Sequence, residues 1–297
     1  MGFKEELFSF PHAKIFFDYP LKKHSSFGVG GNAKYFASVK SLYGLKELLE
    51  LCKRYKKKYK ILGNGSNILF SDKGYSGIII SLKSISDIFF KKNEVKAMAG
   101  ATLQKLLEFN LSNNLGGIEC LTGIPATIGG AVVMNAGAFG KNISNYIVSV
   151  ETLKKGRIVV YNNKECKFKY RQSRFKSKSE VIVSATFSFP KLSGEIIEAS
   201  IKNYTSFRRA IQPNGRSCGS VFKNPKGFYA GELIDKALLK GLRVGGAVVS
   251  NQHANFIIAE QNATASDICS LICKIKEVIK NKFNILLEEE VEYVGDF

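Results

Sequence analysis

Apolar residues recur along the first two thirds of the chain with two different periods. Between Leu45 and Cys52 they follow the i, i+3, i+4, i+7 spacing of an amphipathic helix, whereas continuous runs such as Gly77–Leu82 are typical of buried strands. The predicted elements are a helix over 41–57, strands at 59–62 and 77–82, a helix from 103 to about 116, a hairpin with strands over 146–153 and 158–161, and a strand over 180–189. This order predicts a mixed α+β domain rather than one doubly wound sheet.

A second unit is predicted after the short run Pro190–Gly194, whose composition is typical of a linker. The elements predicted beyond it are a helix over 230–238, a helix that begins at the capping box of Thr264 and Asp267, and a strand over 285–294. No internal repeat is present. We therefore expect two domains, residues 1–190 and 191–297.

Composition fits a folded protein and adds one unusual feature, a large excess of positive charge. Of the 297 residues 45% are hydrophobic, which excludes a disordered chain. Lys and Arg number 44 against 25 Asp and Glu, so the formal net charge is +19. Such a charge favours nucleic acid, a membrane surface or a phosphorylated small molecule as partner, and by itself it does not choose among them.

The sequence gives no signal for export, membrane insertion or metal binding. The first 14 residues contain no apolar core behind a basic flank, so we predict no signal peptide. The uncharged stretch Cys120–Gly140 contains too many glycines, and a proline, to span a membrane. None of the six cysteines forms a CxxC pair and only three histidines are present, so we predict no metal site and a reduced, cytoplasmic protein.

One glycine motif is excluded as a dinucleotide site. Gly28–Ala33 matches the G-x-G-x-x-A fingerprint, which requires a buried apolar strand directly before it. The preceding residues 22–26 are Lys-Lys-His-Ser-Ser, which is not such a strand. A glycine-rich turn is sufficient to explain the motif.

Two other segments of small residues indicate a large phosphorylated cofactor. Gly63–Asn67 follows an apolar strand, and its glycines allow left-handed backbone and expose N–H groups, as in loops that wrap a phosphate. A tight turn would use the same residues. Gly123–Ala138 is rich in glycine and alanine, which lets the backbone approach a flat or anionic ligand closely. Neither segment is a Walker A sequence.

Three polar stretches are candidates for binding or catalysis. Tyr170–Phe175 concentrates arginine donors, which suit the capture of a carboxylate or phosphate. Ser220 follows a glycine within Ser217–Pro225, where a hydroxyl could donate a proton. An acidic run lies near the end of the chain, where Glu288 and Glu290 share one face of the predicted strand. The plainer interpretations are a solvated strand end, an ordinary turn and a charged edge strand that blocks aggregation.

Five motifs follow one another in a recognisable order: LGNGSNIL (62–69), GIPATIGGAVVMNAGAFG (123–140), YRQSRF (170–175), CGSVFKNP (218–225) and LLEEEVEYVG (286–295). Together they resemble the UDP-N-acetylenolpyruvoylglucosamine reductases, flavoenzymes of peptidoglycan precursor synthesis, and HSSFGVGGNA (24–33) fits the start of that family. The resemblance spans about residues 21–295. Only 49 residues separate Arg171 from Ser220, which leaves no room for the inserted subdomain of the longer members and implies the short, type II form.

The resemblance implies an FAD-binding domain of the vanillyl-alcohol-oxidase/PCMH type, with lobes over about 21–82 and 83–190, and a smaller α+β substrate domain. It implies NADPH as hydride donor and UDP-N-acetylglucosamine enolpyruvate as substrate, reduced to UDP-N-acetylmuramate. We expect a monomer without nucleic-acid or membrane partners. The residues implied at FAD are Gly63, Asn64, Gly65, Ser66, Asn67, Gly123, Ile124, Pro125, Ala126, Thr127, Ile128, Gly130, Asn135, Gly137 and Ala138.

The same resemblance implies roles in catalysis. Ser220 is similar to the family's proton donor, and Arg171 and Glu290 to the pair that holds the enolpyruvyl carboxylate and stabilises the charge that develops on it. Substrate contacts are implied for Tyr170, Lys223, Asn224 and His253. For the histidine, a buried structural role fits equally well.

The sequence departs from the family pattern at two positions, which puts local substrate contacts in doubt. Arg216 stands where a proline or small residue is expected, and Ala259 stands where asparagine is common. Two other functions stay open. A flavin oxidase of the same fold would use oxygen, and its covalently flavinylated members need a His or Cys near the ring, for which Cys120 is the candidate. A nucleic-acid-binding module would explain the charge, but no RRM, KH or zinc pattern follows the basic run 53–60.

Overall fold

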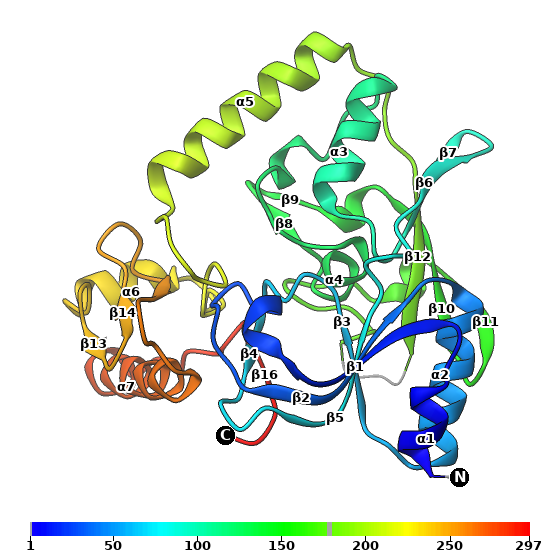
Figure 1. Cartoon of the computed structure of the whole chain (residues 1–297). Coiled ribbons are helices and arrows are strands. Elements are labelled where there is room, and N and C mark those ends of the chain that lie inside the picture. The colour runs from blue at the N-terminus through cyan, green and yellow to red at the C-terminus, as the bar shows by residue number, and fades with distance from the viewer. Residues whose placement is uncertain (1, 177–179) are drawn as a thin grey trace. The chain divides into compact units, whose positions relative to one another are not determined.

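Figure 1 shows the protein as a computed structural model, which describes residues 2–176 and 180–297. The chain forms two compact units, each assembled from three separate stretches of sequence. Unit 1 comprises Met1–Phe16, Phe36–Asn64 and Ile78–Arg208, and unit 2 comprises Phe17–Tyr35, Gly65–Gly77 and Arg209–Phe297. Unit 2 therefore takes in two early segments that sequence spacing alone assigns to the first domain.

Unit 1 is built around a five-stranded sheet with the order β11-β10-β12-β7-β6. Its strands are β6 (Ile88–Lys91), β7 (Glu94–Met98), β10 (Ile147–Lys154), β11 (Arg157–Asn162) and β12 (Val181–Phe187). All seven residues of the central strand β12 are buried, which explains its nearly continuous apolar sequence. The predicted hairpin is confirmed, because β10 and β11 pair antiparallel around Lys155 and Gly156, both left-handed as a two-residue hairpin turn requires.

The helices of unit 1 are α1 (Phe3–Phe8), α2 (Leu42–Arg54), α3 (Leu103–Ser112), α4 (Ile128–Val133) and most of α5 (Gly194–Ile211). The predictions of α2 and α3 are confirmed, and each begins at a hydroxyl N-cap, Ser41 and Thr102. In contrast, α5 was not predicted. It begins at the end of the expected linker, and Ile197 is its one buried residue. Because most of its apolar residues are not buried, α5 lacks the core-facing apolar stripe by which an amphipathic helix is predicted from sequence.

Several smaller elements complete the framework. A four-stranded sheet has the order β1-β2-β5-β3, and three of these strands, β1, β2 and β5, continue from one unit into the other. Its strands are β1 (Ala13–Pro20), β2 (Asn32–Val39), β3 (Tyr59–Leu62) and β5 (Tyr75–Ser81). The short strands β8 (Gly137–Ala138) and β9 (Lys141–Asn142) pair with each other, and single 3-10 turns cover Leu21–His24, Glu119–Leu121, Ile143–Asn145 and Lys164–Cys166.

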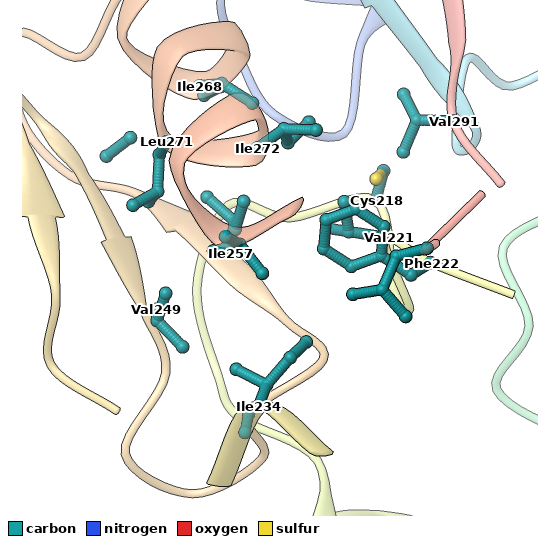
Figure 2. Close-up of a cluster of buried hydrophobic side chains, with 14 of the residues drawn as sticks. Cys218, Val221, Phe222, Ile234, Val249, Ile257, Ile268, Leu271, Ile272 and Val291 are labelled. Carbon is teal, nitrogen blue, oxygen red and sulfur yellow. The ribbon is translucent and has the colours of Figure 1, made fainter. Parts of the chain in front are cut away.

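Unit 2 packs two helices and short strands around one apolar cluster. Its elements are β4 (Ile68–Phe70), α6 (Ala230–Lys236), β13 (Arg243–Val244), β14 (Ala247–Val249), β15 (Ile257–Ala259), α7 (Ala265–Phe283) and β16 (Glu292–Val294). Figure 2 shows Ile268, Leu271 and Ile272 of α7 in the same buried cluster as Val221 and Phe222. The predicted capping box of Thr264 is confirmed at the start of α7.

The early segments of unit 2 are held by its C-terminal part. Asp72 accepts hydrogen bonds from the backbone N–H groups of Ala265 and Ser266, both at 2.9 Å, and so caps α7 from a distant stretch of the chain. Strand β4 pairs in parallel with β16. The last strand is shorter than predicted, because only Glu292–Val294 are strand and Glu289 forms an isolated bridge.

No helix in the part of the chain that the structure describes is long and apolar enough to cross a membrane.

Candidate functional site

The two small-residue segments predicted from sequence lie in contact within unit 1. A Cβ atom placed on Gly63 would come within 2.4 Å of the Thr127 hydroxyl oxygen, so no larger residue fits there without a shift. Asn64 donates from Nδ2 to the Pro125 carbonyl at 3.2 Å. The structure thus brings residues 63–64 of the first segment together with Pro125 and Thr127 of the second.

The Gly123–Ala138 segment is braced by its own polar side chains. Gly123 has a φ of +75°. The Thr127 hydroxyl caps α4 by accepting from Gly130 N–H at 3.4 Å. Asn135, buried and left-handed, donates to the Lys169 carbonyl at 3.1 Å. Its amide therefore links the segment to the turn that carries Arg171. This contact is structural.

The remainder of the first loop belongs to unit 2. Gly65 has a φ of +68°, and a Cβ there would overlap the His24 carbonyl oxygen, so only glycine fits. The Gly65 carbonyl accepts from Ser26 N–H at 3.2 Å. Asn67 donates from Nδ2 to the Glu290 carbonyl at 2.9 Å. This loop therefore fixes the backbone of one predicted catalytic residue.

Arg171 occupies a turn position that favours glycine or asparagine. Lys169 and Gln172 exchange backbone hydrogen bonds of 2.9 and 3.2 Å around it, and Arg171 has a φ of +52°. Its Nη1 donates to the Gly137 carbonyl at 3.0 Å. The guanidinium also lies 5.3 Å from the ring of Tyr170, which is 53% exposed. The left-handed turn and the bond to Gly137 together hold the Arg171 side chain against the small-residue segment.

A second arginine of the same motif is structural. The guanidinium of Arg174 stacks 3.8 Å from the centroid of the Tyr161 ring and lies 3.8 Å from Glu180. The Glu180 carboxylate is only 2% exposed and also pairs with Lys154 at 3.1 Å. Burial alone raises the pKa of this carboxyl, but the hydrogen bonds and positive charges around it outweigh burial, so its pKa lies below the ordinary value. This ionised cluster anchors the chain after Arg171.

Ser220 and Glu290 lie on neighbouring extended segments of unit 2. Val221 donates to the Asn255 carbonyl at 2.9 Å and accepts from Glu290 N–H at 2.7 Å. Ser220 itself bridges to Phe256, directly after a glycine with a φ of +79°. The segment with the predicted proton donor is therefore held on both sides by backbone hydrogen bonds.

Asn255 is a positioning residue that was not predicted. Its side chain is 4% exposed, accepts from Phe222 N–H at 2.9 Å and donates to the Phe222 carbonyl at 2.8 Å. Both backbone groups of Phe222 are thereby satisfied by one amide, two residues after Ser220. The sequence signal that could have identified this residue is a single asparagine inside the apolar run 254–259.

His253 has the surroundings of a structural histidine. Its Nδ1 accepts from Asn255 N–H at 3.2 Å, and its ring meets Phe256 edge-on at 4.8 Å. Burial lowers the pKa of His253, and the positive charge of Lys240 lowers it further. The ring is therefore neutral at pH 7.

The other predicted substrate contacts already have protein partners. Lys223 forms an ion pair of 2.6 Å with Glu288, and Asn224 accepts from Ala230 N–H at 3.0 Å at the start of α6. Nearby, burial and the negative charge of Glu290 raise the pKa of Cys218, so this thiol stays neutral.

The two departures from the family pattern contact each other. Arg216 donates from Nε to the Ala259 carbonyl at 3.0 Å and from Nη2 to the Glu260 carbonyl, while Ala259 N–H donates back to the Arg216 carbonyl at 2.9 Å. The arginine is therefore accommodated by a local exchange of hydrogen bonds. Neither residue is joined by a hydrogen bond to Ser220 or Glu290.

Among residues 2–176 and 180–297, no three His, Cys, Asp or Glu side chains are arranged to hold a metal ion.

The fold and the small-residue loops define a flavoprotein. Residues 33–161 match the family described as FAD binding domain. BBE-like 1 of Physcomitrella patens has the same fold, with a TM-score of 0.50 and 16% identity over 64% of this chain and 45% of that one. The expected fold class is confirmed.

The rest of the chain identifies the family. Residues 212–294 match the C-terminal domain of UDP-N-acetylenolpyruvoylglucosamine reductase. The reductases of Listeria innocua and Caldanaerobacter subterraneus are 39% and 38% identical to this chain, over at least 94% of each sequence. The crystal structure of the Thermus caldophilus reductase has a TM-score of 0.83 and 32% identity, covering 95% of this chain and 99% of that one. The chain belongs to the UDP-N-acetylenolpyruvoylglucosamine reductase family, as the motifs predicted.

Proposed function

We propose that this protein reduces UDP-N-acetylglucosamine enolpyruvate to UDP-N-acetylmuramate with NADPH and FAD, as a cytoplasmic monomer of peptidoglycan precursor synthesis. Nucleic acid and membranes are not partners in this proposal. Residues 1–190 chiefly bind FAD and residues 191–297 chiefly bind substrate. The observation that carries the proposal is Arg171, held in a glycine-type turn and hydrogen-bonded to the small-residue segment.

The small-residue loops fit FAD. Side chains are excluded at Gly63 and Gly65, and the left-handed Gly123 lets the neighbouring backbone turn sharply. The residues proposed to hold FAD are Gly63, Asn64, Gly65, Ser66, Asn67, Gly123, Ile124, Pro125, Ala126, Thr127, Gly130, Asn135, Gly137 and Ala138. The chemistry that FAD supplies when bound is transfer of a hydride from NADPH to the enolpyruvyl double bond.

Arg171 binds the enolpyruvyl carboxylate. Addition of a hydride to a double bond conjugated with a carboxylate moves negative charge onto the carboxylate oxygens. A guanidinium fixed in advance stabilises that charge without reorganising during the reaction. The bond from Nη1 to Gly137 and the turn around Arg171 provide this fixed position.

Ser220 delivers the proton that completes the reduction. One carbon of the double bond gains the hydride, and the adjacent carbanion must then gain a proton. The ladder through Val221 holds the Ser220 backbone in place, and Glu290 joins the same ladder and acts with Arg171 at the carboxylate. Tyr170, Lys223, Asn224 and His253 are proposed to contact the sugar nucleotide or nicotinamide.

The two half-reactions test this proposal separately. Purified protein should show a flavin absorbance spectrum that NADPH bleaches and the enolpyruvyl sugar nucleotide restores under anaerobic conditions. Ser220→Ala should keep the bleaching step and lose the restoring step. Ser217→Ala, on the same turn, is the matched control and should keep both. If Ser220→Ala keeps both steps, the serine is not the proton donor. If the wild type binds no flavin, the function itself is refuted.

A further inference from the structure

Unit 2 contains a polar cavity that the proposed reaction does not use. Its volume is about 710 Å³, within the range of roughly 300–1,000 Å³ that is typical of small-molecule pockets. It lies at the opposite end of β4 from the proposed catalytic residues. Asp72, which lines the cavity, follows β4, whereas Asn67, which donates to the Glu290 carbonyl, precedes it. The other lining residues are Lys22, Arg216 and the segments 28–30 and 261–263.

The glycine loop that begins at Gly28 is fixed against two other walls of this cavity. Gly31 donates to the Ser71 carbonyl at 2.9 Å, and a Cβ on Gly31 would overlap the backbone oxygen of Asp72. A Cβ on Gly28 would lie 2.9 Å from Cδ of Arg216. The motif that fails as a dinucleotide fingerprint therefore has a structural reason, because larger residues would not fit between these walls.

The same loop offers backbone donors. Gly28 and Gly30 are left-handed, with φ angles of +66° and +114°. Within the described chain the N–H groups of Val29 and Gly30 donate no hydrogen bond. Loops of this kind can bind a phosphate through exposed N–H groups, as the sequence suggested for other glycines of this chain.

The cavity also carries two cations that no carboxylate neutralises. In the described part of the chain no Asp or Glu forms an ion pair with Lys22 or Arg216, and Lys22 makes no side-chain hydrogen bond. Arg216 bonds through Nε and Nη2 to backbone carbonyls, which leave its charge in place. The carboxylate of Asp72 accepts from two backbone N–H groups at the start of α7 and from the Ser266 hydroxyl. The cavity is therefore positively charged.

We propose that this cavity binds the phosphate group of a small phosphorylated molecule, with Lys22 and Arg216 as the two cations. A phosphate group carries about two negative charges and three acceptor oxygens, so it can accept from both cations and from the glycine loop together. A carboxylate has one charge and two oxygens in one plane, and it would leave part of these donors unused. The volume leaves room for the rest of the molecule beside residues 261–263.

The experiment measures binding of inorganic phosphate to the FAD-loaded protein by isothermal titration calorimetry at constant ionic strength. Lys22→Gln should weaken this binding at least about 10-fold, because it removes a charged donor. Lys23→Gln is the matched control, since Lys23 is the exposed neighbour that does not line the cavity, and it should bind phosphate like the wild type. Arg216→Lys keeps the charge but loses the planar fork, so it should also weaken binding. The kcat/KM for the enolpyruvyl sugar nucleotide should be unchanged in Lys22→Gln.

Three results would overturn the proposal. A wild type that binds no phosphate would refute it directly. If Lys22→Gln binds phosphate as tightly as Lys23→Gln, the anion is held elsewhere, for instance where the substrate diphosphate binds. If acetate binds as tightly as phosphate, the cavity is a general anion-binding surface and has no preference for phosphate.

Discussion

Arg171 and Ser220, the proposed carboxylate-binding and proton-donating residues, are held in place by opposite means. Arg171 sits on a four-residue turn, in a left-handed conformation that favours glycine, and its guanidinium is anchored to the Gly137 carbonyl. Ser220 lies on an extended segment that exchanges backbone hydrogen bonds with neighbours on both sides. Arg171 therefore adopts a backbone conformation that is unfavourable for arginine, whereas the position of Ser220 is set by backbone hydrogen bonds.

Because of this difference, we expect stability and activity to respond independently to mutation at Arg171 and together at the Ser220 segment. At Arg171 we expect glycine to relieve the left-handed backbone, so loss of the side chain should cost the folded protein little stability. At the Ser220 segment the groups that position the serine are also core groups, because Val221 and Phe222 are buried in the cluster of unit 2 (Figure 2). Damage there should therefore affect folding and catalysis together.

The largest expected effect comes from Arg171→Gly. We expect kcat/KM to fall about 10²–10³-fold, because a preorganised cation is lost at the developing charge. The free energy of unfolding should stay unchanged or rise by up to about 1 kcal/mol, because glycine relieves the left-handed backbone. Steady-state kinetics and urea unfolding measure the two. Arg171→Lys should recover part of the activity, and a strongly destabilised glycine variant would contradict the turn argument.

Asn255→Ala tests the Ser220 segment and should lower both stability and activity. Both backbone groups of the buried Phe222 lose their partners, which should lower the free energy of unfolding by about 2–4 kcal/mol. We also expect slower reoxidation of reduced flavin by substrate, since Ser220 lies on the same segment. The exposed Asn251→Ala is the control. If Asn255→Ala unfolds at the wild-type denaturant concentration, the amide does not hold this segment.

Gly63→Ala should weaken FAD binding about 10-fold with little effect on the Ser220 segment. The new methyl group would lie 2.4 Å from the Thr127 hydroxyl oxygen, so the two loops must separate. In the double variant Gly63→Ala with Thr127→Ala the nearest Thr127 atom, Cβ, lies 3.4 Å away, and part of the affinity should return. Fluorescence titration with FAD measures both. Unchanged affinity in the single variant would show that this contact does not shape the site.

The smallest effect is expected for Glu180→Gln, which probes the ionised cluster after Arg171. The pKa of Glu180 lies below its ordinary value in the folded protein, so its charge stabilises the fold above the unfolded pKa of about 4.3. That contribution disappears as the pH falls through the folded pKa. The Tm of the variant should be lower than that of the wild type at pH 7, corresponding to about 1 kcal/mol, and the two should converge in acid. A difference that persists below pH 3 would exclude this charge effect.

Local signals predicted much of the fold. The hairpin of β10 and β11 has its turn glycine in the sequence, and the capping box of Thr264 marks the start of α7. The strand at the C-terminus was predicted too long, because the alternation over 285–294 reflects one isolated bridge at Glu289 as well as true strand pairing at Glu292–Val294. The inclusion of residues 17–35 and 65–77 in unit 2 had no local signal at all.

The candidate site likewise contains residues that the sequence predicted and residues that only the fold reveals. Arg171, Ser220 and Glu290 were predicted as site residues because they stand in ordered motifs. Asn255 was missed because its role comes from contacts with Phe222, a residue that is distant in sequence. Sequence pattern identifies residues that belong to a motif, whereas residues that position a motif are identified by the fold.

The parallel pairing of β4 with β16 has a consequence for synthesis of the protein. Ile68 emerges from the ribosome early, and its partner Glu292 follows about 220 residues later, which at roughly 5–20 residues per second is a delay of about 10–45 s. During this time the apolar segment Ile68–Phe70 has no strand to pair with, and α7, which Asp72 caps, does not yet exist. Unit 2 can close only when translation is nearly finished, so ribosome-bound and prematurely terminated chains should depend on chaperones to protect this segment.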